Sequence, residues 1–335
     1  MPSTPIPSGP APALFGDGSD AQRFSLKRDT IQHPAAIAWA DRTIFAELVR
    51  WRAAWLSPYE LAGYNNCGIE KRRMDYLLGR LAAKLAIYTL LQEPESALQS
   101  SDSDIDQPRL SQLRSIEIAL GAFTQPLARA PQGGGVASSN NISPAVCYAH
   151  SDGVAVALAF PDGHPLGVDL EVVAERRVKM LKTQINDTEL AGVLPSVYAG
   201  SSAPNVAEGM VVPTETDAYT QAWCAKEALS KILRCGLTVP FEVLALKNTR
   251  VVSSPVPRLE GEFKNFTQYR FESLTVGRFA FSLVLPRRTT AAWPSEWLCE
   301  RLEASAPTDT TVPSVRLAPR PTEPAADPET TAALT

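Results

Sequence analysis

The sequence predicts an α+β protein made of two similar halves that face each other across a cleft. Two observations lead to this fold class. A strongly helical segment, 69–91, is followed by strand-like segments as far as 160, and a second helix, 220–233, is followed by strand-like segments as far as 285. With 335 residues, 44% of them hydrophobic, the chain can fill the core of one large domain or two smaller ones. We therefore expect two pseudo-symmetric α+β halves.

The two ends of the chain differ in composition from the middle. Residues 1–22 are rich in Pro, Ser, Ala and Gly, and we expect a disordered leader that lacks the features of a signal peptide. Residues 303–335 are Pro, Thr and Ala with scattered charges, which predicts a disordered tail. Between them we expect an N-terminal half over 23–160 and a C-terminal half over 161–302.

The first half begins with helical patterns. Ser57 can cap a short helix that has Pro58 at its first position. On the helix 69–91, Arg73, Arg80 and Lys84 line up beside the apolar stripe, where long cationic side chains can reach into a groove. Gly121 to Asn141 is expected to be irregular. The elements predicted in chain order are helices 43–55 and 69–91, then strands 116–120, 147–150 and 154–160.

The second half begins with a strand that carries acidic residues and contains one long helix. Gly236 is well placed to cap the C-terminal end of that helix. Residues 195–215 give little signal and are expected to form an insertion. The elements predicted in chain order are strand 166–172, helices 183–191 and 220–233, and strands 243–246, 269–274 and 278–285.

The composition argues against several classes of partner. A net charge of −4 and a pI of about 5.6 give no global attraction to nucleic acid or to an anionic membrane. The five cysteines are odd in number and have no Cys-x-x-Cys spacing, which favours reduced thiols in the core. The longest apolar runs are strand-sized, so we expect a soluble, cytoplasmic protein.

Two short sequence strings contain four charged side chains that could form one site. In an extended Gly167-Val168-Asp169-Leu170-Glu171, the side chains of Asp169 and Glu171 project from the same face. In a helical Trp223 to Lys231, Glu227 and Lys231 are neighbours because they are four residues apart. Three carboxylates and one ammonium could then converge and hold Mg²⁺ against a phosphate-bearing substrate. Taken singly, the strand acids could equally lie on a solvent face, and the helix pair could be a surface ion pair.

Together the two strings resemble the signature of the Sfp-type 4′-phosphopantetheinyl transferase superfamily. That signature joins Gly-(Ile/Val)-Asp-x-Glu to a later Trp-(Ser/Thr/Cys)-x-Lys-Glu-(Ala/Ser)-x-x-Lys, followed here by Gly236. Weaker matches occur at 56–60, from Arg72 to Arg80, and at 148–151, so the resemblance covers roughly 54–285. It implies a fold of two pseudo-symmetric α+β halves with the active site, coenzyme A and Mg²⁺ in the cleft between them.

By this resemblance the protein would transfer the phosphopantetheine arm of coenzyme A to a serine of an acyl or peptidyl carrier protein, releasing adenosine 3′,5′-bisphosphate. Asp169, Glu171 and Glu227 would hold Mg²⁺, Lys231 would neutralise the pyrophosphate, and Glu227 is the candidate base for the serine hydroxyl. Contacts to the coenzyme A phosphates and adenine would come from Arg72, Arg73, Arg80, His150, Lys226 and Lys231.

The resemblance is incomplete at one position, and alternatives stay open. Ala149 stands where the family usually has Ser before the histidine, which removes one hydroxyl contact and about 1 kcal/mol of coenzyme A binding. A catalytically silent relative that binds coenzyme A or a carrier domain is the main alternative. A metal-dependent phosphodiesterase or nuclease is disfavoured by the acidic pI. We expect a monomer, because the cleft needs no second subunit.

Overall fold

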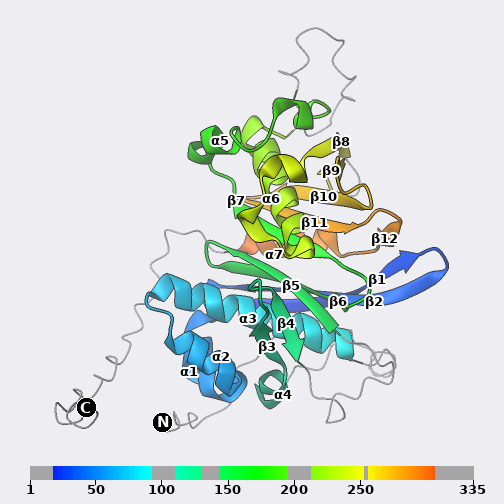
Figure 1. The fold of residues 1–335 in the computed structure, drawn as a ribbon. Helices are drawn as coiled ribbons and strands as arrows, with labels where there is room; N and C mark the ends of the chain where they lie inside the picture. The colour runs from blue at the N-terminus through cyan, green and yellow to red at the C-terminus, as the bar shows by residue number, and fades with distance from the viewer. Residues whose placement is uncertain (1–17, 93–109, 130–143, 195–212, 253–255, 306–335) are drawn as a thin grey trace, which may run out of the picture.

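The computed structural model describes residues 18–92, 110–129, 144–194, 213–252 and 256–305. These residues form an α+β fold with two five-stranded antiparallel sheets, each covered by one long helix. The expected insertion 195–215, apart from its last three residues, and most of the expected leader and tail lie outside the described residues. The expectation of two α+β halves is confirmed (Figure 1), where the first half lies below and the second above.

The first sheet has the strand order β12-β1-β2-β6-β5 and carries the helix α3 on one face. The sheet surface under α3 is made of alanines from β2 and β6, and small side chains of this kind let a helix pack close to the backbone. The elements are β1 (Ser19–Arg28), β2 (Ile31–Asp41), β5 (Pro144–Ser151), β6 (Val154–Pro161), β12 (Thr289–Ala291) and α3 (Glu70–Leu91).

The second sheet has the strand order β7-β11-β10-β9-β8 and carries the helix α6. Its central strand pair, β10 and β11, is almost entirely buried between α6 and the first half. The elements are β7 (Gly167–Val172), β8 (Leu246–Val252), β9 (Arg258–Phe263), β10 (Tyr269–Val276), β11 (Phe279–Pro286) and α6 (Glu215–Leu233).

The two sheets face each other through a shared core. Trp39 and Leu158 from the first sheet meet Leu170 and Phe281 from the second in one buried cluster, while each helix covers the outer face of its own sheet. The resulting order is helix, sheet, sheet, helix. The strands β5 and β7 run next to each other where the halves meet.

Each half also contains a buried ion pair of the same construction. Lys84 of α3 lies 2.6 Å from Glu60, and Lys226 of α6 lies 2.9 Å from Glu189. Both glutamates close a capping box at the start of a short helix. Each also accepts a backbone N–H from a strand that comes later in the chain, after the long helix of its half. The matching positions are Trp55, Ser57, Glu60, Lys84, Leu113 and Ile118 in the first half, and Gln184, Asn186, Glu189, Lys226, Phe241 and Leu246 in the second.

Shorter elements complete the fold. The helices are α1 (Phe45–Trp55), α2 (Pro58–Asn65), α4 (Leu110–Ser115), α5 (Glu175–Leu181) and α7 (Ser295–Ala304), with 3-10 turns at Arg42–Ile44, Asp187–Leu190, Gly236–Thr238 and Phe241–Leu244. The strands β3 (Glu117–Leu120) and β4 (Pro126–Arg129) form a separate hairpin. No described helix is long and apolar enough to cross a membrane.

The structure corrects several sequence-based expectations. The helix expected at 183–191 lies earlier, at α5, and only the 3-10 turn Asp187–Leu190 falls in that range. The strand expected at 243–246 is a 3-10 turn followed by β8, and the irregular stretch after 121 contains β4. The strand β1 begins at Ser19, inside the expected leader 1–22. The left-handed residue that ends α6 is Arg234, with φ 55°, and not Gly236.

Candidate metal and phosphate site

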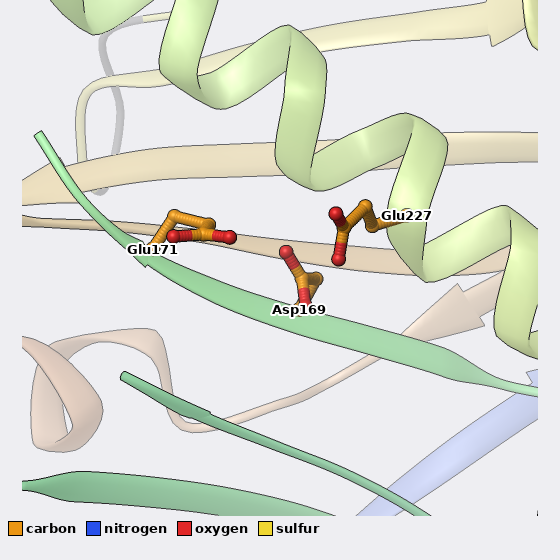
Figure 2. A group of neighbouring side chains, drawn as sticks. All are labelled: Asp169, Glu171 and Glu227. Carbon is orange, nitrogen blue, oxygen red and sulfur yellow. The ribbon is translucent and has the colours of Figure 1, made fainter. Parts of the chain in front are cut away.

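Three carboxylates meet between β7 and α6. Asp169 and Glu171 project from one face of β7, and Glu227 projects from α6 toward them, as Figure 2 shows. One oxygen from each side chain lies within 4.8 Å of the other two. The convergence predicted from the two sequence strings is therefore present in the fold.

The local sequence explains why the strand and helix can approach so closely. Val168 and Leu170 are buried in the core between the sheets, which turns Asp169 and Glu171 to the opposite face, toward α6. At Gly167 an added Cβ would lie 2.2 Å from the Ala228 carbonyl oxygen, so only glycine permits this contact. The acidic face of β7 is thus held against the α6 turn that carries Glu227.

Two cations stand at opposite ends of the acidic cluster. The Lys231 ammonium donates to Asp169 Oδ1 at 2.8 Å and to the carbonyl oxygens of Val168 and Tyr148. The Arg177 guanidinium, from α5, donates to Glu171 Oε2 at 2.5 Å. Sequence reasoning identified Lys231 but missed Arg177, because the helix was expected at 183–191 and Arg177 falls outside both motifs.

The electrostatics of the cluster favour a bound cation. Burial and then the neighbouring Asp169 carboxylate raise the pKa of Glu227 to about 8. Asp169 Oδ2 is buried and has no hydrogen-bond partner among the described residues. Three carboxylates with an unpartnered buried oxygen fit the hard oxygen ligation of Mg²⁺. Although burial opposes it, the Asp169 carboxylate raises the pKa of Lys231 overall, which keeps this ammonium charged.

A cavity of about 600 Å³ adjoins the cluster through Lys231. It lies between the β3–β4 hairpin, strand β5 and the C-terminal end of α6, with Gln125, Tyr148 and Arg234 among its lining residues. Lys231 therefore belongs both to the acidic cluster and to the wall of a cavity large enough for a cofactor-sized ligand.

The comparison with protein families addresses the same region. Residues 165–284 match the family model of the 4′-phosphopantetheinyl transferase superfamily. The match spans β7, α6 and β8 to β11, and so includes all three carboxylates, Arg177 and Lys231. It confirms the resemblance drawn from the two motifs, and it supports phosphopantetheinyl transfer in general terms. A search of curated proteins found no match to the chain.

His150 stands at the end of β5, on the first-half side of the cleft. Its side chain is partly exposed and lies against α3, with Nδ1 3.9 Å from Asp75 Oδ1. Burial against α3 lowers the pKa of His150, opposed by the Asp75 carboxylate. Asp75 was not singled out from the sequence, since an acid on a helix gives no signal until its neighbour is known.

The three arginines expected to contact the nucleotide differ in their accessibility. Arg72 is exposed, and Arg73 is half-buried and donates to the Cys67 carbonyl oxygen. Arg80 is only 4% exposed, because it stacks on Tyr76 and donates to the Tyr148 hydroxyl at 2.6 Å. Direct contact of Arg80 with a ligand would require these rings to move, whereas Arg72 and Arg73 remain open to one.

Lys226 does not point into the cleft, which corrects its expected role as a phosphate contact. Its side chain is fully buried in the second half and donates to Glu189 and to the carbonyl oxygens of Gln184 and Phe241. Adjacent residues of a helix point in different directions, so Lys226 faces the core where Glu227 faces the cluster. Its place is structural, as for Lys84 in the first half.

Proposed function

We propose that this protein is a Mg²⁺-dependent 4′-phosphopantetheinyl transferase that uses coenzyme A to modify a serine of an acyl or peptidyl carrier protein. The observation that carries the proposal is the convergence of three carboxylates and the Lys231 ammonium, within the segment that matches this superfamily. The cluster lies beside a cavity of about 600 Å³, which gives the rest of coenzyme A a place to bind.

The roles of the side chains follow from their positions. Asp169, Glu171 and Glu227 would hold Mg²⁺, which when bound neutralises charge on the pyrophosphate. Lys231 would bind the pyrophosphate and stabilise the negative charge that develops on the leaving group. His150, Arg72 and Arg73 would contact the nucleotide from the first half.

The chemical step is a displacement at phosphorus. The carrier serine oxygen forms a bond to the phosphorus that carries the pantetheine arm, and the bond from that phosphorus to the bridging oxygen breaks. Adenosine 3′,5′-bisphosphate leaves with the bonding electrons, and the serine proton passes to a base. Glu227 is our candidate for that base, although a carboxylate engaged with a cation is a weaker base than a free one.

The decisive experiment is an assay by mass spectrometry. The protein is incubated with coenzyme A, Mg²⁺ and an apo carrier protein, and the carrier is then weighed. A gain equal to one phosphopantetheine arm supports the transferase. Binding of coenzyme A without any gain in mass favours the silent relative instead, an alternative to which only Ala149 points.

Two variants make the assay specific to the site. Glu227→Gln removes one carboxylate charge from the cluster while keeping the size of the side chain, and we expect it to abolish transfer. Glu175→Gln changes an exposed acid on α5 in the same half and is expected to leave transfer unchanged. Near-normal transfer by Glu227→Gln would remove Glu227 from the mechanism.

A further inference from the structure

Arg177 occupies a position that neither sequence motif includes. It lies in the third position of α5, and its guanidinium reaches the Glu171 carboxylate at 2.5 Å. About a quarter of its side chain is exposed, at 26%, so the contact is partly sheltered from solvent. Its neighbour on the same helix, Arg176, is exposed. Of these two adjacent arginines, the structure therefore brings Arg177 to the acidic cluster.

Each of the two strand carboxylates has its own cation. Lys231 contacts Asp169 and Arg177 contacts Glu171, while Glu227 reaches both carboxylates from α6. Three carboxylates with two cations leave a net charge of about one negative unit when all are ionised. Without Arg177 the same cluster would carry two negative charges. Arg177 therefore supplies part of the positive charge that offsets the repulsion among the three carboxylates.

A small metal ion at this cluster would lie close to Arg177. Mg²⁺ binds oxygen at about 2.1 Å, so two oxygens on opposite sides of the ion are about 4 Å apart. The three oxygens lie within 4.8 Å of one another, so an ion bound by all three would share Glu171 with Arg177. Arg177 approaches Glu171 from α5, and its hydrogen bond holds one Glu171 oxygen.

We propose that Arg177 is the counter-ion of Glu171 in the metal-free protein and that it competes with the divalent cation, and so sets the affinity of the site. This inference rests on the proposed function only in taking the three carboxylates to be a metal site. It assigns to Arg177 an action through Glu171, and thus makes it a positioning residue and not a catalytic one.

The test compares Arg177→Gln with Arg176→Gln, two variants that remove the same charge from adjacent positions of one helix. Binding of Mn²⁺ to the full-length, chelator-treated protein is measured by the loss of the free-ion electron paramagnetic resonance signal, without coenzyme A. Arg177→Gln is expected to bind Mn²⁺ about tenfold more tightly than the unsubstituted protein, because a competing charge next to the ion is gone. Arg176→Gln is expected to change the affinity less than about twofold, as an exposed charge is screened.

A second readout follows stability and does not depend on catalysis. Without metal, Arg177→Gln is expected to melt at a lower temperature than the unsubstituted protein, since Glu171 has lost its partner, and saturating Mn²⁺ is expected to give it the larger rise in melting temperature. Arg177→Lys keeps the charge and is expected to restore most of the original behaviour.

Each outcome decides between the alternatives. Weaker Mn²⁺ binding in Arg177→Gln, or a change equal to that in Arg176→Gln, overturns the inference, as does the absence of binding in both the unsubstituted protein and Arg177→Gln. Glu227→Gln serves as the control that locates the ion, because it must lose binding if the ion occupies this cluster. Tighter binding in Arg177→Gln without any transfer of the arm would uphold the inference while rejecting the proposed function.

Discussion

The Lys231 ammonium lies 2.8 Å from Asp169 Oδ1 and also donates to the Tyr148 carbonyl oxygen at 3.3 Å. Asp169 belongs to β7 of the second half and Tyr148 to β5 of the first, so a single side chain joins the two walls of the cleft. Lys231 also lines the cavity. Lys231 therefore holds β5 and β7 together and also places a positive charge beside the cavity.

We expect Lys231→Gln to lower the rate of arm transfer by about a hundredfold or more, because a preorganised cation at a developing negative charge is worth that much. The measurement is kcat and KM for coenzyme A in the carrier assay. Lys182→Gln removes an exposed lysine that pairs with Glu215, and it provides the control. Turnover by Lys231→Gln within a few fold of normal would show that the ammonium does not act on the phosphates.

The raised pKa of Glu227 predicts how stability depends on pH in the absence of metal. The folded-state pKa of about 8 lies above the usual 4.5, so between these values the folded protein binds more protons than the unfolded chain. The free energy of unfolding should therefore fall as the pH rises from 6 to 8. Glu227→Gln stays neutral, so its free energy of unfolding should fall less steeply over this range. The difference in slope from the unsubstituted protein should be up to about 1.4 kcal/mol per pH unit.

Urea unfolding at pH 6, 7 and 8 with a chelator present would measure this effect. Glu175→Gln, an exposed acid on α5, should follow the unsubstituted protein at all three values. Parallel curves for Glu227→Gln and the unsubstituted protein would mean that Glu227 titrates normally. Saturating Mg²⁺ should stabilise the unsubstituted protein more than Glu227→Gln, since only the unsubstituted protein keeps all three ligands.

His150 provides a test of where the nucleotide binds. Loss of a hydrogen bond to a charged phosphate costs about 1.5–3 kcal/mol, so His150→Ala should raise KM for coenzyme A by about tenfold or more, with a smaller effect on kcat. His33→Ala is a suitable control, because His33 lies on β2 and contacts His164 at 5.2 Å between ring centroids. An unchanged KM in His150→Ala would move the nucleotide away from the end of β5.

The two buried lysines should have equivalent effects on stability. Lys84→Met and Lys226→Met each leave a buried glutamate without its cation, and each should lower the free energy of unfolding by about 3–5 kcal/mol. Denaturant unfolding checks this, with the exposed Lys179→Met as control. If Lys226→Met kept full stability and lost only coenzyme A binding, the lysine would be a ligand contact after all.

The sequence predicts the fold class and the cluster because both rest on local patterns. Alternation along Gly167 to Glu171 and the four-residue spacing of Glu227 and Lys231 determine which way these side chains point once strand and helix form. Arg177 and Asp75 could not be found in the same way. Each is linked to the site only by a partner on another element, and the tertiary packing of α5 and α3 brings those partners together.

The same limit applies to the short strand β12, which was not predicted from the sequence. β1 pairs along its length with β2, and its other edge is covered in part by β12, more than 250 residues away in the chain. Burial of Lys226 is a further case, since the helix motif that contains this lysine gives no sign of the Glu189 carboxylate that neutralises it. The burial of Lys226 and the covering of β1 by β12 both depend on segments that are distant in the chain.

The short strand β12 has a consequence for how the molecule is made. It comes after all the strands of the second sheet, yet it lies on the open edge of β1 in the first. During synthesis, which runs from the amino end, β1 must wait for residues 289–291 to leave the ribosome before that edge is covered. An unfinished chain would expose unpaired backbone groups there, ready to join with a neighbouring nascent chain. The first half is thus completed only by a segment that is translated after the second sheet.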